Sequence, residues 1–149
     1  MRIRKLSYEF LNSVRTGYNF PAWVEAFGHW ARVDLDNPKN YRCWLGAKFH
    51  SGEPVEHKRY IPIRDDEALA LDEALNGVCG QNKYYKSLIE EFVIKESSCL
   101  DVLRSKWIGR RYKRLNRQFN LKTLIEDKEK LFENIRLAVL EMMENKNED

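Results

Sequence analysis

Residues 104–122 read RSKWIGRRYKRLNRQFNLK, and residues 123–143 continue as TLIEDKEKLFENIRLAVLEMM. The first stretch holds eight Lys or Arg residues and no acidic one, whereas the chain beyond residue 125 holds eight acidic residues and four basic ones. In the second stretch, apolar residues recur at intervals of three and four, which is the spacing of one helix face. They are Leu124, Leu131, Ile135, Ala138 and Met142, interrupted only by Lys128. The two stretches therefore predict a basic segment that leads into a long amphipathic helix.

The basic stretch is expected to hold a short helix of its own over residues 110–119. Tyr112, Leu115 and Phe119 would form its apolar side, because they follow one another at helical spacing. Gly109 would break the chain before this helix. The helix would therefore be anchored on one side and cationic around the rest.

A turn over residues 120–122 is expected to connect this helix to the long one. Thr123 would be the N-cap of the long helix, since a Thr side chain can accept a hydrogen bond from a free N–H of the first turn. The helix would reach about Met143. A short helix, a tight turn and a second helix form the helix-turn-helix pattern of many DNA-binding proteins, although ordinary helical hairpins share it and are commoner.

Two placements of a DNA-reading helix remain open. In the first, residues 110–119 support and residues 123–130 enter the groove. In the second, residues 99–107 support and the Arg-rich residues 110–118 enter the groove themselves. The second placement is electrostatically easier, because acidic side chains at the start of the long helix would repel phosphates. These acidic residues are Glu126, Asp127 and Glu129.

Double-stranded DNA is the expected ligand of the basic stretch. Its cations have no acidic residue within the stretch to pair with, so an external anion or a folded-back acidic helix has to neutralise them. The candidate contacts to the DNA backbone are Arg104, Lys106, Arg110, Arg111, Lys113, Arg114, Arg117 and Lys122. The candidate base readers are Asn116, Gln118 and Thr123, and Asn and Gln suit adenine in the major groove.

Helical periodicity also extends upstream of the basic stretch. Short helices are expected over residues 7–15, 21–32, 65–80, 83–96 and 99–107, with Gly77 and Gly80 ending the third of them. Trp23, Phe27 and Trp30 follow helical spacing, which favours a place in the core over a ligand-stacking role. Residues 33–63 lack a helical period and contain several Pro and Gly residues, so a loop or an irregular hairpin is expected there.

The chain of 149 residues is expected to form one domain over residues 1–149. Residues 1–64 would hold the N-terminal helices and the irregular segment, residues 65–144 the helical core with the helix-turn-helix, and residues 145–149 a frayed tail. The fold class is therefore mainly α. The expected core residues are Phe27, Trp30, Leu71, Leu75, Leu88, Phe92, Leu103, Leu115, Phe119, Leu131 and Ile135.

Several classes of function are disfavoured by composition. Three cysteines without a CxxC spacing favour free thiols in a reducing, cytoplasmic setting. No stretch approaches the roughly 18 apolar residues of a membrane span, so no membrane partner is expected. The His residues and Cys43 do not follow zinc-finger spacing, and we expect neither a metal nor another cofactor. The chain lacks the P-loop, GxSxG and HExxH motifs, and the acidic group at residues 65–67 suits a helix start, so we do not expect an enzyme.

The order of motifs resembles a family of phage transcription regulators. WVEAFGHWARV at 23–33, IRDDEALALDEAL at 63–75 and YYKSLIEEFVIKESS at 84–98 precede the basic pair of helices. Over roughly residues 23–140 this order resembles the Q-type antitermination proteins of lambdoid phages, and looks closest to a shorter phage family related to them. The zinc-binding insertion of some Q proteins is absent, and the basic block is longer than their usual tight turn.

The resemblance implies a regulator, encoded by a phage or prophage, with a helix-turn-helix similar to region 4 of sigma factors. Such a protein binds DNA, contacts RNA polymerase near a late promoter and makes it read through terminators. The alternative is a helical adaptor or assembly protein, whose last helix forms a homodimer or docks on a partner while the basic block meets an acidic protein surface. RNA binding is less favoured, because no RRM, KH or dsRBD signature is present.

Overall fold

The computed structural model describes residues 6–33, 60–81 and 84–147, and within these ranges the chain is helical without β-strands. In chain order the elements are α1 (Tyr8–Thr16), α2 (Phe20–Val33), α3 (Asp65–Gln81), α4 (Tyr84–Ile89), the π-helix η4 (Glu90–Ile94), α5 (Cys99–Leu103), α6 (Lys106–Arg114) and α7 (Leu121–Asn147). The prediction of a mainly α fold is confirmed. Most of the segment expected to be irregular, residues 34–59, lies outside the described residues.

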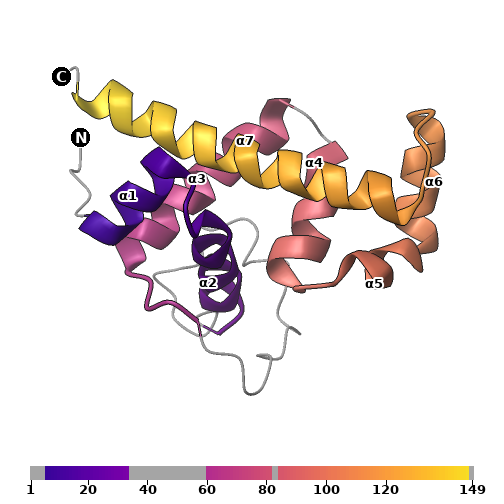
Figure 1. Cartoon of the computed structure of the whole chain (residues 1–149), viewed down its shortest axis with the longest axis horizontal. Coiled ribbons are helices and arrows are strands. Elements are labelled where there is room, and N and C mark those ends of the chain that lie inside the picture. The colour runs from indigo at the N-terminus through magenta and orange to yellow at the C-terminus, as the bar shows by residue number, and fades with distance from the viewer. Residues whose placement is uncertain (1–5, 34–59, 82–83, 148–149) are drawn as a thin grey trace.

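Helix α7 runs along the molecule from end to end (Figure 1). Helices α1 and α3 lie near its C-terminal half, while α4, α5 and α6 lie near its N-terminal half. Leu124, Leu131 and Ile135 are all 0% exposed, because these helices cover the apolar stripe of α7. The predicted long amphipathic helix is therefore confirmed, and burial of each of these side chains contributes about 1.5–3 kcal/mol to folding.

The N-terminal helices are joined to α3 through a buried carboxylate. Ser7 caps α1 by accepting a hydrogen bond from the Phe10 N–H at 3.3 Å. The backbone N–H and the hydroxyl of Ser7 both donate to Glu67, which is 0% exposed, and the Arg64 N–H donates to the same carboxylate at 3.1 Å. Acidic residues at the start of α3 are favourable for that helix, and Glu67 in addition holds the start of α1 through Ser7.

The aromatic residues of α2 lie in the core, and their polar atoms have partners. The Trp23 indole N–H donates to the Ser13 hydroxyl at 3.0 Å. The Trp30 indole N–H donates to Asp65 at 3.1 Å. Phe27 is 0% exposed between them. The prediction that these aromatic residues belong to the core is confirmed.

Helix α2 packs closely against the π-helix η4. A Cβ atom added to Gly28 would lie 2.0 Å from the backbone oxygen of Val93. The expected single helix over residues 83–96 is wrong in this part, since the Lys95 N–H bonds to the Glu90 carbonyl at 3.1 Å, across five residues. A π-turn has more residues per turn, so consecutive side chains diverge less. This explains how three consecutive apolar residues, Phe92, Val93 and Ile94, are all buried.

Several predicted boundaries are wrong. Helix α3 continues through Gly77 and Gly80 to Gln81, and a Cβ atom added to either glycine would have no neighbour within 4 Å. The C-terminal helix stays helical through Asn147, so residues 145–147 of the expected frayed tail belong to α7. Residues 148 and 149 lie outside the described residues.

The boundaries around the basic stretch also differ from expectation. Helix α5 ends at Leu103, and Ser105 caps α6 by accepting a hydrogen bond from the Ile108 N–H at 3.3 Å. Helix α6 therefore begins before Gly109, which lies within it, and ends at Arg114. Asn120, and not Thr123, caps α7, because its side-chain oxygen accepts from the Thr123 N–H at 2.9 Å.

Most of the expected core is confirmed. Leu115 is the exception: it follows the last residue of α6 and is 49% exposed, because the helix ends before it. Leu103 and Phe119 are partly buried against the core. The other predicted core residues are buried, namely Phe27, Trp30, Leu71, Leu75, Leu88, Phe92, Leu131 and Ile135.

Candidate nucleic-acid interface

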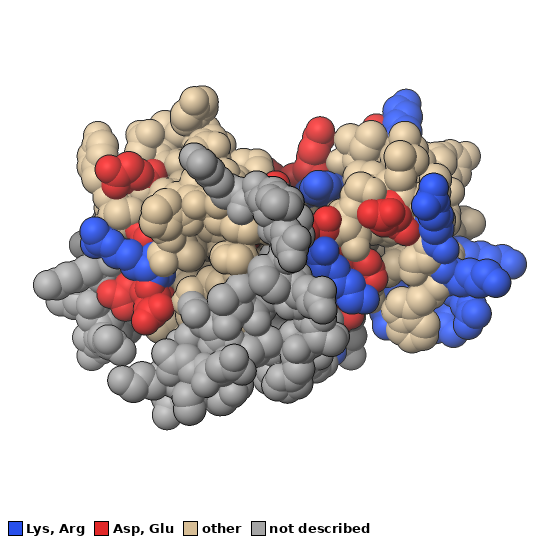
Figure 2. All heavy atoms as spheres, turned by 90° about the horizontal axis from the view of Figure 1, so that it is seen from below, with Lys and Arg blue, Asp and Glu red and all other residues tan. Residues whose placement is uncertain are grey.

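Helix α6 has one buried face and one cationic face. Ile108 and Tyr112, four residues apart, are 1% and 0% exposed and anchor the helix. The opposite face carries exposed cations at helical spacing, which are Lys106, Arg110, Lys113 and Arg114. In Figure 2 the Lys and Arg side chains gather at the end of the molecule that α6 forms. The fold therefore presents this charge outward on an anchored helix.

A buried carboxylate holds the inner side of α6. Asp127 of α7 is 4% exposed. It accepts hydrogen bonds from the hydroxyls of Tyr84 at 2.8 Å and Tyr112 at 2.7 Å, and it also pairs with Arg117. Since the two tyrosines come from α4 and α6, one side chain connects three helices and the turn after α6. We call Asp127, Tyr84, Tyr112 and Arg117 the Asp127 cluster.

The tyrosines of the Asp127 cluster stay protonated well above neutral pH. Burial raises the pKa of Tyr84, and the hydrogen bonds with Tyr112 and Asp127 raise it further. Burial also raises the pKa of Tyr112, against a smaller lowering by its contact with Tyr84. Both phenols are therefore neutral at physiological pH and can donate their protons in hydrogen bonds to the Asp127 carboxylate.

Arg117 differs from the other cations of the basic stretch. Its guanidinium pairs with Asp127, so it is the one cation of the basic stretch that the structure ties to a described carboxylate of α7. Partial burial lowers the pKa of Arg117, but the negative charge of Asp127, the interactions with Tyr84 and Tyr112 and the hydrogen bond to Asp127 together raise it, and the net shift is upward. Arg117 thus holds the turn after α6 in place, while its role as a DNA contact stays a prediction.

The remaining cations are free of such pairs. Six of them are exposed and make no ion pair with any carboxylate in the described ranges, namely Arg104, Lys106, Arg110, Lys113, Arg114 and Lys122. Arg111 is partly buried, and its guanidinium lies 4.8 Å from the ring centre of Trp107. The acidic residues of α7 therefore leave most of the charge on this stretch uncompensated.

The candidate base readers do not lie on α6. Asn116 and Gln118 belong to the turn over residues 115–120, where Asn116 has a φ of 55°. The side-chain oxygen of Gln118 accepts a hydrogen bond from the Asn120 side chain at 3.2 Å. Thr123 is partly buried in the first turn of α7. The structure thus brings the cations together on one helix but separates the amide side chains from it.

Neither expected placement of a reading helix matches the observed boundaries fully. Helix α5 is joined to α6 by residues 104–105, and α6 is joined to α7 by residues 115–120. The placement in which the Arg-rich helix reads is the nearer one, because α6 holds most of the exposed cations. Helix α7 instead exposes Glu126 and Glu129 near its start.

Asp127 is the residue of this site that sequence reasoning misplaces. The sequence groups it with the acidic residues expected to repel DNA, yet its carboxylate faces inward. The signal that could have placed it is its position, three residues after Leu124 and four before Leu131, which lies on the buried side of the helix. A charged residue at such a position predicts a buried polar contact.

The described residues offer few other sites. No group of three or more His, Cys, Asp or Glu side chains among them could hold a metal ion, and no helix among them is long and apolar enough to cross a membrane. A groove of about 440 Å³ lies between α7 and the start of α2. Its rim includes Glu129, Glu133, Lys128 and Arg136, so it does not concentrate charge of one sign.

Comparisons with protein-family models, with curated proteins and with solved structures found no match for this chain. The resemblance to Q-type antitermination proteins therefore rests on the sequence motifs alone.

Proposed function

We propose that the protein binds double-stranded DNA through the exposed face of α6, without enzymatic activity. The observation that carries this proposal is the set of six exposed cations, four on α6 and one on either side of it, that no described carboxylate neutralises. A solvated helix face normally mixes charges of both signs, since pairs at i,i+4 stabilise it. Helix α6 has no acidic residue on any side. A polyanion would supply the missing negative charge.

The energetic source of this binding would be the release of counterions from DNA. Each phosphate that a Lys or Arg neutralises adds about 0.9 to the negative slope of log affinity against log salt. If all six cations engaged phosphates, the slope would approach about −5. The Asp127 cluster supports such binding because it holds α6 against α4 and α7, so that ordering the helix adds no cost on binding.

We propose that α5 supports α6 and that α6 lies along the major groove, as in the helix-turn-helix proteins. Base reading would then fall to side chains of α6 or to Asn116 and Gln118 at its C-terminal end. The acidic residues near the start of α7 make that helix a poor alternative, because they would face the phosphates.

The alternative is an adaptor that dimerises through the apolar stripe of α7, but this stripe is buried within the chain itself. Leu124, Leu131 and Ile135 are 0% exposed within the chain itself, and Ala138 and Met142 pack against the same core. Lys128, which interrupts this stripe, lies 5.3 Å from the Phe92 ring centre. A dimer built on this face would require the core to open.

The salt dependence of duplex binding tests the proposal. Arg110→Ala combined with Arg114→Ala is expected to weaken binding to all duplex sequences and to reduce the salt slope by about two. Arg111 is left unchanged, because its contact with Trp107 makes a loss of packing hard to separate from a loss of charge. Affinity is measured by fluorescence anisotropy with labelled duplex at several salt concentrations.

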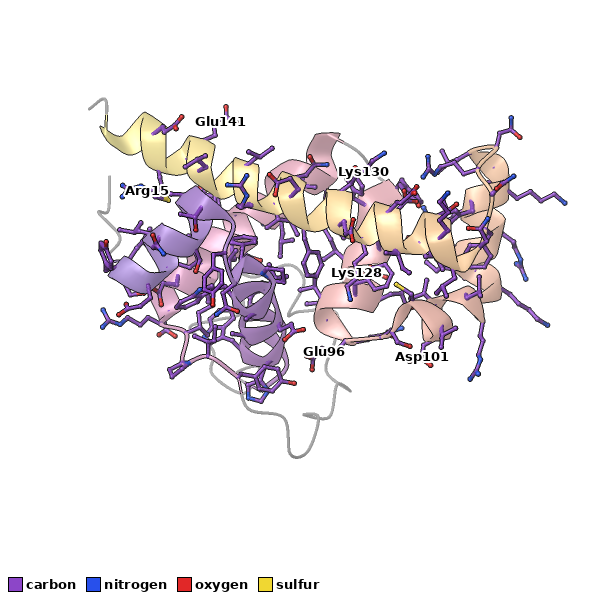
Figure 3. All side chains as sticks on the ribbon, in the orientation of Figure 1. Arg15, Glu96, Asp101, Lys128, Lys130 and Glu141 are labelled. Carbon is purple, nitrogen blue, oxygen red and sulfur yellow. The ribbon has the colours of Figure 1, made fainter. Side chains whose placement is uncertain are left out.

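The matched control removes two cations elsewhere. Arg15→Ala combined with Lys130→Ala changes the net charge equally, and both residues are exposed and lie away from α6 (Figure 3). This variant is expected to retain the wild-type slope. If both variants lose affinity equally, or if neither does, the assignment of the interface to α6 is wrong.

The proposed biological setting is regulation of transcription in a phage or prophage, with antitermination of late genes as the activity. Its support is the resemblance of residues 23–140 to the Q-type proteins. Such a protein would also contact RNA polymerase. Immobilised wild-type protein should retain purified bacterial RNA polymerase above the level retained by a blank matrix, and no enrichment would contradict this part of the proposal.

A further inference from the structure

Trp107 is exposed on the cationic face of α6, where it does not contribute to the core. It is 58% exposed, although Ile108 beside it is 1% exposed and anchors the helix. Exposing a large indole to water is unfavourable, and aromatic side chains on surfaces are typical of binding sites. Its neighbours on the helix surface are all cationic. Trp107 is therefore the one feature of this face that charge alone does not explain.

Arg111 holds the indole in a defined position. The guanidinium lies 4.8 Å from the ring centre, at the distance of a cation–π contact. The Nε atom of Arg111 is covered and has no hydrogen-bond partner among the described residues. The guanidinium of Arg111 thus covers part of the Trp107 ring, and the rest of the ring is exposed to solvent.

We propose that Trp107 and Arg111 form a stacking platform for an unpaired nucleobase. The proposal rests on the proposed function and adds to it a preference for duplex DNA in which at least one base is out of the helical stack. Inside a duplex the faces of each base are covered by its neighbours, and only base edges are presented in the grooves. An unstacked base offers its face, and such bases stack on aromatic rings and on guanidinium groups.

The spacing of charges around Trp107 suits a nucleotide. Arg110 follows it by three residues and Arg114 by seven, so both lie on the same side of α6. Side chains three or four residues apart on a helix are about 5–6 Å apart at their Cβ atoms. A base on the indole would therefore place its phosphates within reach of these cations.

The test compares two labelled duplexes that differ only in one unpaired adenine bulge. Trp107→Leu is expected to weaken binding to the bulged duplex by roughly 5- to 150-fold, the loss expected for one stacked base. Binding to the intact duplex should weaken by a smaller factor than binding to the bulged duplex, because no base face is available there. Trp107→Phe should retain part of the preference. Tyr8→Leu, which removes an aromatic residue that is 77% exposed, is the matched control and should bind both duplexes as the wild type does.

Fluorescence gives a second measurement. The chain has four Trp residues, so the emission of Trp107 is taken as the difference between the wild type and Trp107→Phe. Stacking should quench this emission with the bulged duplex and leave it nearly unchanged with the intact duplex. Equal losses of affinity on both duplexes, or no loss on either, would overturn the stacking platform.

The two proposals fail in different ways. If Arg110→Ala with Arg114→Ala leaves the affinity for intact duplex unchanged, the proposed function itself is wrong. If that variant binds duplex weakly while Trp107→Leu shows no selective loss on the bulged duplex, only the stacking platform is wrong.

Discussion

A single glycine sets how closely two elements of the core approach. Gly28 of α2 faces the backbone of η4, and an added Cβ would lie 2.0 Å from the Val93 oxygen. Backbone atoms cannot move aside as a flexible side chain can. We therefore expect Gly28→Ala to lower the free energy of unfolding by about 3 kcal/mol, as overpacked sites do, despite the better helix propensity of Ala. Urea denaturation followed by circular dichroism measures the change.

Gly77 is the matched control for this residue. It lies within α3, and a Cβ added there would have no neighbour within 4 Å. Only the difference in helix propensity remains, so Gly77→Ala should raise the free energy of unfolding by about 0.5–1 kcal/mol. A similar effect of the two substitutions would show that α2 and η4 are not in close contact.

At the scale of elements, sequence periodicity predicts which segments are helical better than where they end. The stripe Leu124, Leu131 and Ile135 identifies α7, because a regular pattern is repeated over many turns. The starts of α6 and α7 are harder to place, since each depends on one local side chain. Ser105 and Asn120 accept the hydrogen bonds that start α6 and α7, and several other polar residues nearby could have done the same.

The π-turn is not predictable in the same way. It lies where η4 comes close to Gly28 of α2, and a tertiary contact of this kind leaves no periodic signal in the sequence. Glycine is also a poor guide to helix ends. Gly77, Gly80 and Gly109 all lie within helices, because a glycine costs a helix only about 1 kcal/mol and packing can outweigh that.

At the scale of the whole molecule, the sequence shows where the cations are but does not show the buried contacts that hold α6 in place. The clustering of cations over residues 104–122 is visible without a structure. The pairing of Asp127 with side chains from three other segments depends on the fold, because Tyr84 is 43 residues away in the chain. Arg117 accordingly belongs to the Asp127 cluster, whereas Lys106, Arg110, Lys113 and Arg114 of α6 are exposed and make no ion pair with a described carboxylate.

The Asp127 cluster also couples the stability of the whole fold to alkaline pH. In the unfolded chain a Tyr ionises near its usual pKa of 10.0, while burial holds the pKa of Tyr84 and Tyr112 above that value in the folded protein. Below pH 10 both states keep these protons, so the stabilisation is fully present. Above pH 10 the unfolded state releases them first, and each phenol then lowers stability by up to about 1.4 kcal/mol per pH unit.

Tyr84→Phe combined with Tyr112→Phe separates this effect from other titrations. The variant should be less stable at pH 8, since each hydrogen bond to the carboxylate contributes about 1.5–3 kcal/mol. Its stability should nevertheless fall less steeply between pH 10 and pH 11 than that of the wild type. Burial also raises the pKa of Cys79 to about 11, but this thiol is present in both proteins and its contribution cancels. Urea denaturation at each pH measures the two slopes, and equal slopes would mean that the phenols are not held neutral in the folded protein.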